Sequence, residues 1–290
     1  MRGGNKPNLS GSQLSWAPHR LSWLSVMVGN NSSVENARST NLLELSAQAQ
    51  YANASDCEQI ELDICRSASP TSVHFQHAEA LTKILQCWVA LNKGIGYSQG
   101  MDMMSIVLYT HFIENNSPKP LHDTLAALGF VCRINAAFIP LHPHDKTPMN
   151  NAALFATEVW LEVSSANPSL GGQLLTCLGH VEIFAIKYLA VCFANLFSLP
   201  TLRVVWDYFF DSTGLSRNAA LSLAARRCRH YTSACFILHK KLFQHGKDTT
   251  QNFSIFENLL AQLTDTQAAQ RTIDVARHLE RVETLGGSAQ

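Results

Sequence analysis

The sequence predicts an all-α protein, and three observations lead to this class. Apolar residues recur at helical spacing through most of the 290 residues, glycine and proline fall between these runs, and no stretch alternates apolar with polar residues as a strand does. Hydrophobic residues make up 46% of the chain and charged residues 15%, which is ample material for a large core. The length suits either one large domain or two subdomains that share a core, and we expect two helical subdomains with a continuous core.

The first half of the chain begins with residues 1–17, which are rich in Gly, Asn, Ser and Pro and predict a flexible tail. After this tail, apolar spacing places helices at about 42–54, 60–66, 81–93 and 99–111. Pro118 and Pro120 then mark the expected boundary between an N-terminal subdomain, about 18–118, and a C-terminal subdomain, about 119–245.

The second half continues the same pattern. Its spacing places helices at about 125–138, 152–164, 170–178, 181–197, 202–213 and 218–245. Residues 188–202 form the most apolar uncharged stretch, but they are too few to span a membrane and include Pro200, so they predict a buried helix. Residues 246–290 predict amphipathic C-terminal helices, whose apolar faces we expect to pack against the body.

Charge and cysteine usage narrow the function classes. Lys+Arg and Asp+Glu balance at 22 each, which argues against binding of nucleic acid, because phosphates call for a basic surface. The 8 cysteines are scattered without a Cys-x-x-Cys pair, as is typical of buried, reduced thiols in a cytoplasmic protein. The N-terminus has no compact apolar run like that of a secretory signal. We therefore expect a cytoplasmic protein.

The first segment whose side chains could take part in chemistry is 60–66, Ile-Glu-Leu-Asp-Ile-Cys-Arg. Ile60 and Ile64 lie one helical turn apart and can anchor a helix to the core, while Asp63 and Arg66 are three residues apart and can pair. The Ser/Pro residues that follow favour a turn, which would leave a long cationic side chain at the end of an anchored helix. Taken alone, such an arginine is most often a solvated surface residue.

The second segment is 94–101, Gly-Ile-Gly-Tyr-Ser-Gln-Gly-Met. Two glycines before Tyr97 allow a tight turn, and Gln99 falls near the start of the next helix, where unpaired N–H groups favour anions such as phosphate. A glutamine side chain has one acceptor and two donors, so it can hold a water and a phosphate oxygen together. Taken alone, this segment is also a weak signal.

Together the two segments resemble the paired signature of TBC domains, the helical GTPase-activating domains for Rab GTPases. The matching residues are Ile60-x-x-Asp63-x-x-Arg66, followed by Gly96-Tyr97-x-Gln99-Gly100-Met101. Two further elements agree. Leu202-Arg-Val-Val-Trp206-Asp207 resembles the Trp-Asp helix of the family, and Arg20-x-x-Trp23 resembles its opening motif. The resemblance covers about residues 20 to 215 and implies a TBC-like fold in which Trp23, Trp206 and Asp207 are structural.

The resemblance implies a GTPase activator that supplies two side chains to a GTP-bound Rab and regulates vesicle trafficking. Arg66 would offset charge on the transferred phosphoryl group, and Gln99 would orient the attacking water. Asp63 would hold Arg66 or bind the partner, and Tyr97 would pack and position the loop. Gly100 belongs to the same group of orienting or partner-binding residues. No cofactor is expected, because GTP and Mg²⁺ belong to the GTPase, and the chain would have no hydrolase activity of its own. Transient peripheral association with endomembranes is compatible with such a partner.

Departures from the family pattern leave alternatives open. Cys65 stands where proline is common, and Ser-Ala-Ser at 67–69 replaces a more usual Thr-Phe-Pro. A catalytically inactive adaptor, which binds a GTPase or another partner without accelerating hydrolysis, is therefore the alternative to an activator. An unrelated helical scaffold is a third possibility. Residues 113–180 match no motif, so the identity of the Rab is not predicted.

Two weaker candidates have simpler explanations. His142, His144 and Asp145 could form half of a metal site, but no second pair lies at useful spacing, so we expect a polar loop and no metal. The helix around 225–241 is basic, and a solvated face is a better account than contact with an acidic membrane. Its basic residues are Arg226, Arg227, Arg229, Lys240 and Lys241.

Overall fold

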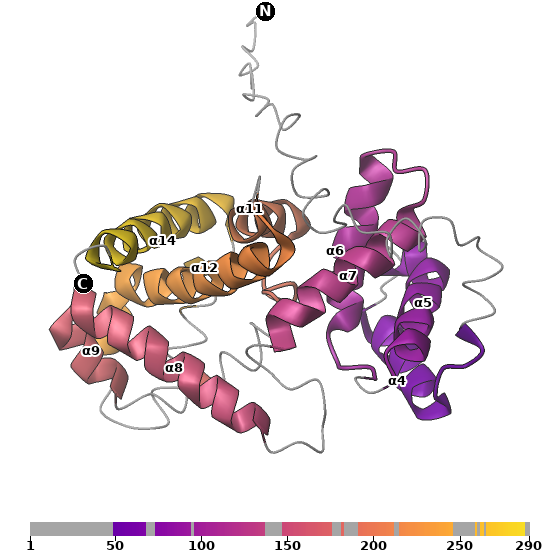
Figure 1. Cartoon of the computed structure of the whole chain (residues 1–290), viewed down its shortest axis with the longest axis horizontal. Helices are drawn as coiled ribbons and strands as arrows, with labels where there is room; N and C mark the ends of the chain where they lie inside the picture. The colour runs from indigo at the N-terminus through magenta and orange to yellow at the C-terminus, as the bar shows by residue number, and fades with distance from the viewer. Residues whose placement is uncertain are drawn as a thin grey trace, which may run out of the picture.

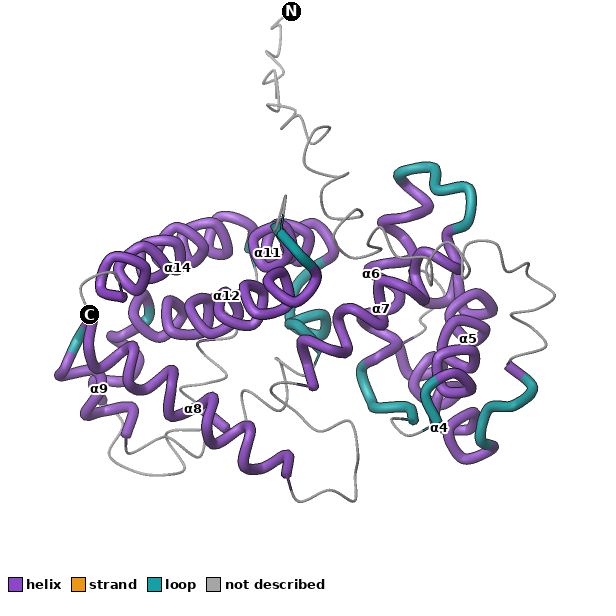
Figure 2. The backbone as a smooth tube through the Cα atoms, in the orientation of Figure 1, coloured by secondary structure: helices purple, strands orange, loops and turns teal. Residues whose placement is uncertain are grey.

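The structure is a computed structural model. It describes residues 49–67, 73–93, 96–136, 147–175, 181–182, 191–211, 215–245, 259, 262–263 and 265–287. Across these residues the ordered elements are all helices and no strand is present, as Figures 1 and 2 show. The prediction of an all-α fold is confirmed.

The N-terminal helices form one packed group (Figure 1). They are α4 (Ala54–Ser67), α5 (Val73–Leu91), α6 (Met101–Glu114) and α7 (Pro120–Ala136). Helix α5 packs on α4, α6 and α7, and α6 also packs on α7 and touches α4. Helix α6 is buried on nearly all sides, because its apolar residues follow one another without a polar face.

The C-terminal helices form a second group (Figure 1). They are α8 (Thr147–Ala166), α9 (Pro168–Leu175), α11 (Leu199–Phe210), α12 (Arg217–Leu238), the 3-10 helix η2 (Lys240–His245) and α14 (Thr266–Gly287). Helix α12 is the centre of this group, since it packs on α8, α11 and α14 and also reaches α7. An ion pair of 2.6 Å between Arg203 of α11 and Glu114 of α6 adds a second link between the groups.

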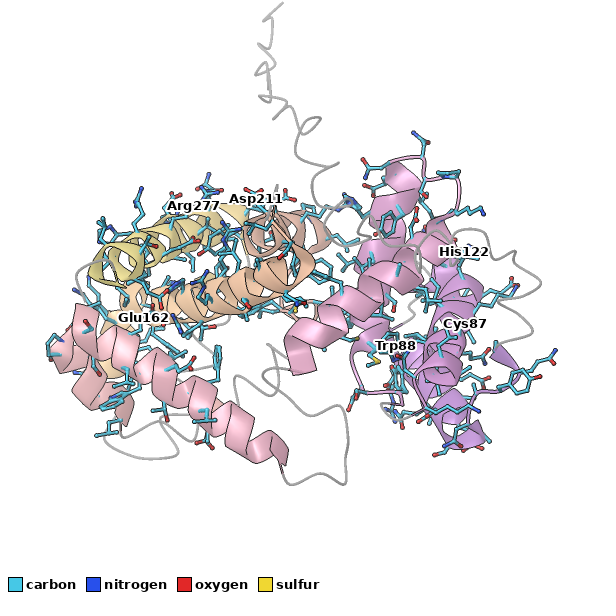
Figure 3. All side chains as sticks on the ribbon, viewed as in Figure 1. Cys87, Trp88, His122, Glu162, Asp211 and Arg277 are labelled. Atoms are coloured by element: carbon cyan, nitrogen blue, oxygen red, sulfur yellow. The ribbon has the colours of Figure 1, made fainter. Side chains whose placement is uncertain are left out.

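A single hydrophobic core runs through both groups, from Ile60 to Leu279. Figure 3 labels Trp88, one of the core residues among the N-terminal helices. One part of the core is aromatic: the centroid of the Tyr231 ring lies 5.4 Å from that of Phe193 and 5.5 Å from that of Phe209. Edge-to-face packing of this kind is favourable beyond the area that it buries.

The predicted helix over 181–197 is wrong in its last part. Residues 191–197 form turns, and Cys192 and Phe193 have left-handed backbones, with φ of 47° and 64°. The tertiary contacts explain the difference. The indole N–H of Trp206 donates to the Cys192 carbonyl at 2.7 Å, and the Phe193 ring enters the aromatic core. A regular helix would use that carbonyl internally, so a buried tryptophan and a ring contact outweigh local helical preference.

The helix predicted over 218–245 is likewise interrupted. Helix α12 ends at Leu238, and residues 240–245 continue as the tighter η2. The C-terminal region packs on the body as expected, with Ile273 and Ala276 of α14 buried against α11 and α12.

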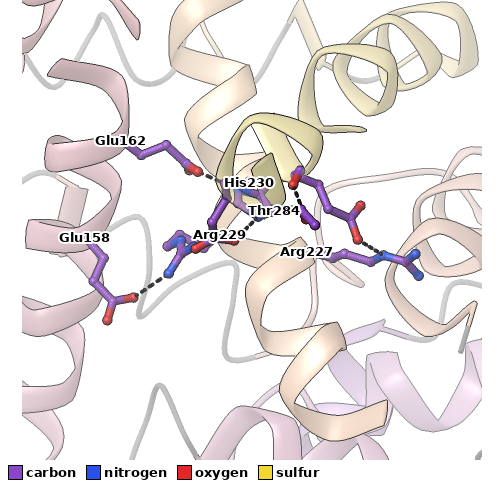
Figure 4. A network of polar contacts seen from close by, with 8 residues as sticks. Glu158, Glu162, Arg227, Arg229, His230 and Thr284 are labelled. Carbon is purple, nitrogen blue, oxygen red and sulfur yellow. Dashed lines mark hydrogen bonds and ion pairs between the residues drawn. The ribbon is translucent and has the colours of Figure 1, made fainter. Parts of the chain in front are cut away.

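The basic residues of α12 are not simply a solvated face. Arg227 pairs with Glu280, and Arg229 pairs with Glu283 at 2.6 Å and with Glu158 at 3.5 Å (Figure 4). These ion pairs join α12 to α14 and α8, so two of the five basic residues that the sequence places around 225–241 form contacts within the fold. Arg226 of the same helix is exposed, as the sequence predicted.

The described cysteines are free thiols, in line with the expectation of reduced cysteines. The expectation that they are buried holds for five of them, but Cys65 is exposed and Cys57 is half-buried. Cys65 lies on the outer face of α4, one residue before Arg66. Among the described helices, none is both long and apolar enough to cross a membrane.

Candidate functional site

The end of α4 carries the first half of the candidate site. Ile60, Asp63 and Ile64 face the core because they lie three and four residues apart on one side of the helix. The buried Asp63 carboxylate accepts hydrogen bonds from Gln59 Nε2 at 2.9 Å and from Arg66 Nη1 at 3.2 Å. The Arg66 side chain is 64% exposed, so a buried carboxylate holds one terminal nitrogen of an otherwise solvated guanidinium.

The turn between α5 and α6 carries the second half. Its backbone is fixed against α5, because the Trp88 indole N–H donates to the Gly96 carbonyl at 3.2 Å and the Gly96 N–H donates to the Asn92 carbonyl at 3.0 Å. Gly96 has a φ of 69°, a left-handed conformation that glycine adopts without strain. The hydrogen bond from the buried Trp88 indole therefore fixes the turn at Gly96.

Tyr97 joins the two halves. Its hydroxyl donates to Asp63 Oδ2 at 3.1 Å, so the same carboxylate holds Arg66 through one oxygen and Tyr97 through the other. Burial, followed by the negative charges of Asp102 and Asp63, raises the pKa of the Tyr97 hydroxyl far above its usual range. The hydroxyl therefore stays protonated at neutral pH and remains a donor.

Gly100 sets the start of α6. It is the residue before the helix, with a φ of 94°, and a Cβ at this position would lie 2.3 Å from Val191 Cγ1. Both the backbone and the neighbouring side chain thus require glycine. Gln99 precedes it with an exposed side chain, two residues after the anchored Tyr97.

The structure brings Asp63, Arg66 and Tyr97 into one hydrogen-bonded group and leaves the side chains of Arg66 and Gln99 exposed on its two halves. Trp206 and Asp207 lie on α11, in the other group of helices. Trp206 is fully buried and bonded to a core carbonyl.

Other sequence predictions fall outside the described residues. These are Trp23 with its opening motif and the loop residues His142, His144 and Asp145. Within the described parts of the chain, no group of three or more His, Cys, Asp or Glu side chains could hold a metal ion.

Sequence reasoning missed three residues of this site. Gln59 precedes Asp63 by four positions, a helical spacing that could have revealed the pair. The Ser67 hydroxyl donates a hydrogen bond to the Asp102 carboxylate at 2.8 Å, but the two residues are 35 positions apart, so no local sequence pattern predicts this contact.

The sequence pattern of the RabGAP-TBC family, described as the Rab-GTPase-TBC domain, matches residues 18–229. A solved structure, the Chlamydomonas flagellar RabGAP TBC domain, superposes with a TM-score of 0.58 at 13% identity, covering 89% of this chain and 78% of that one. At that identity the likeness shows the fold alone. No curated protein sequence matches significantly. On the family match, this chain belongs to the Rab-GTPase-TBC domain family, whose general class of partner is the Rab GTPases.

Proposed function

We propose that this protein accelerates GTP hydrolysis by a Rab GTPase, and that Arg66 and Gln99 act in trans on the nucleotide of that GTPase. The observation that carries the proposal is the position of Asp63. One buried carboxylate holds both the exposed Arg66 and, through Tyr97, the turn that bears Gln99. Two exposed polar groups on separate elements thereby share one rigid support, which is what a two-residue catalytic insertion needs.

Arg66 has the chemistry of an arginine finger. A guanidinium carries five N–H donors, and the bond from Nη1 to Asp63 leaves donors for phosphate oxygens. Its positive charge would stabilise the charge that develops on the transferred phosphoryl group, and such a finger is worth roughly 10³–10⁵ in rate. Holding the guanidinium by a carboxylate reduces the freedom that it must lose when the partner docks.

Gln99 has the chemistry of a water-orienting residue. Its carboxamide has an acceptor for the proton of an attacking water and donors for a phosphate oxygen. The residue lies just before the N-terminus of α6, where the helix dipole favours negative charge. Gln99 would therefore approach the γ-phosphate in a favourable local field.

The proposal assigns the remaining chemistry to the partner. GTP and Mg²⁺ belong to the GTP-bound Rab, and this chain supplies no cofactor and has no hydrolase activity of its own. Because Rab substrates reside on membranes, the protein would work in the cytoplasm and associate transiently with endomembranes, where it would regulate vesicle trafficking.

The test is a panel of purified, GTP-loaded Rab GTPases mixed with this protein, with phosphate release followed over time. At least one Rab should respond, and Arg66→Ala or Gln99→Ala should lower the response by roughly 100-fold or more. Arg271→Ala and Gln267→Ala are matched controls, since both residues are exposed on α14, and they should respond as wild type does.

The panel also separates the activator from the adaptor. If no Rab responds, or if the response survives both substitutions, the proposed mechanism is wrong. Binding to a GTP-loaded Rab that persists in both variants, without acceleration by the wild-type protein, would identify an adaptor instead.

A further inference from the structure

We propose that Ser67 is a positioning residue for Arg66: its hydroxyl, bonded to the buried carboxylate of Asp102, fixes the end of α4 against the start of α6. The inference rests on the proposed function, because it concerns how the arginine is aimed relative to Gln99. Ser67 would not touch the nucleotide and would act only through the orientation of its neighbour.

The contact is specific. Ser67 is the last residue of α4 and directly follows Arg66, and its hydroxyl donates to Asp102 Oδ2 at 2.8 Å. The same hydroxyl lies 3.9 Å from Met103 Sδ. Asp102 is 2% exposed and occupies the second position of α6, three residues after Gln99. A hydrogen bond to an ionised carboxylate is stronger than one between neutral groups.

The contact completes a reciprocal arrangement. Tyr97, in the turn before α6, donates a hydrogen bond from its hydroxyl to Asp63 of α4. In the other direction, the Ser67 hydroxyl of α4 donates to Asp102 of α6. One hydrogen bond between two elements would permit them to pivot, whereas two bonds at separate points fix their relative rotation. Arg66 lies between the two attachment points of α4.

The two attachments belong to one polar group. Burial, followed by the negative charges of Asp102 and Asp63, raises the pKa of the Tyr97 hydroxyl. Asp102 therefore acts on the Tyr97 hydroxyl through its charge and on Ser67 through a hydrogen bond. A displacement of Ser67 would be felt at both ends of the site, and a misplacement of about 1 Å in a catalytic group can cost about 100-fold in rate.

The first experiment compares Ser67→Ala, Ser67→Thr and the control Ser55→Ala, which alters an exposed serine at the other end of α4. With the Rab that responds best in the panel, Ser67→Ala should lower kcat about 10-fold and leave KM within about 2-fold. Ser67→Thr keeps the hydroxyl and should restore kcat, and Ser55→Ala should match wild type. In an Arg66→Ala background, Ser67→Ala should cause no further loss.

A second measurement does not depend on activation. Amide hydrogen exchange over residues 96–104 should be about 10-fold faster in Ser67→Ala than in wild type and should return to normal in Ser67→Thr. If Ser67→Ala does not fold, Ser67→Cys, which is similar in size but a weak donor, takes its place with the same expected results.

The outcomes separate the two proposals. Wild-type kcat and wild-type exchange in Ser67→Ala would overturn the positioning role, and so would losses that add fully to those of Arg66→Ala. If no Rab responds to the wild-type protein, the proposed activator function fails, and the exchange data still decide whether Ser67 tethers α4 to α6.

Discussion

The Tyr97 hydroxyl bonds the Asp63 carboxylate at 3.1 Å across 34 positions of sequence. This bond joins the element that bears Arg66 to the turn that bears Gln99, and each of the two side chains is otherwise exposed. The two halves of the candidate site are therefore joined by the buried Asp63 carboxylate and the Tyr97 hydroxyl, and not by a contact between Arg66 and Gln99.

Replacing Tyr97 with phenylalanine should weaken this link and the stability of the fold. The substitution leaves one oxygen of a buried carboxylate without the phenol donor, which costs about 1–3 kcal/mol in the free energy of unfolding. Activation of the responding Rab should fall as well, because the turn that bears Gln99 loses its anchor. Urea unfolding and phosphate release measure the two effects.

Tyr51→Phe is the matched control, since the Tyr51 side chain is 72% exposed. It should leave both the unfolding free energy and the rate unchanged. Wild-type stability and wild-type activation in Tyr97→Phe would show that the bond to Asp63 does not support the site.

Stability should fall in alkaline solution. Burial raises the pKa of Cys87 to about 11 and of Cys132 to about 12, from an ordinary value of 9.0, and it also raises the pKa of Tyr97 from 10.0. The unfolded chain then releases these protons at lower pH than the folded chain does. Folding is thus favoured fully below pH about 9 and progressively less above it, by up to about 1.4 kcal/mol per pH unit for each group.

Urea unfolding between pH 7 and pH 11 measures this loss. Tyr97→Phe should lose less stability than wild type above pH about 10, because it lacks one of the titrating groups. A wild-type unfolding free energy that stays constant to pH 11 would contradict the burial of these thiols and phenols.

Replacing Gly100 with alanine should be strongly destabilising. The new Cβ would meet Val191 Cγ1 at 2.3 Å, and the backbone would keep a φ of 94° that alanine rarely adopts. Together these effects should cost about 2–4 kcal/mol in the free energy of unfolding. Adding Val191→Ala should recover part of the loss by removing the clash.

Gly172→Ala is the control for that experiment. A Cβ at Gly172, within α9, meets no atom within 4 Å, so this variant should be as stable as wild type or slightly more stable. Equal thermal unfolding midpoints for Gly100→Ala and Gly172→Ala would contradict the close approach of Val191.

Removing α14 should prevent cooperative folding, although the helix lies beyond the family match over residues 18–229. The truncation uncovers α11 and α12 and removes Glu283, which bonds both Arg229 and the fully buried His230 (Figure 4). Glu283 is 45% exposed, so its ion pairs contribute little, and most of the loss comes from the apolar burial of Ile273 and Ala276. Circular dichroism during heating should show no sharp transition.

A chain that lacks only residues 288–290 is the control and should unfold as wild type does. If the chain that ends at residue 264 keeps the wild-type midpoint, α14 contributes nothing to the stability of the fold, and its ion pairs with α12 are not stabilising.

Much of the fold follows from local pattern, because the spacing of apolar residues in helices such as α4 predicts which face is buried. Ile60 and Ile64 predict the inward side of α4, and the exposed Arg66 follows from the same spacing. The turn at Cys192 and Phe193 could not be predicted in this way, since its sequence is as apolar as a buried helix. The indole of Trp206, which lies 14 positions away from Cys192, decides the backbone there.

The contacts of the site also divide into those between residues close in sequence, which could be predicted, and those between distant segments, which could not. The pairing of Asp63 with Arg66 is a contact over three positions and could be read from the sequence. The bond from Ser67 to Asp102 depends on how α4 meets α6, and the ion pairs of Arg227 and Arg229 depend on glutamates 53 and 54 positions away. Contacts between distant segments are fixed by packing and leave no local signal.

The most direct test of the central claim uses a responding Rab whose own water-orienting glutamine has been replaced by leucine. If Gln99 supplies that function in trans, the wild-type protein should still accelerate GTP hydrolysis by this Rab variant, and Gln99→Ala should abolish the acceleration. A Rab variant that no longer responds to the wild-type protein would contradict the claim, because the essential glutamine would then be that of the GTPase.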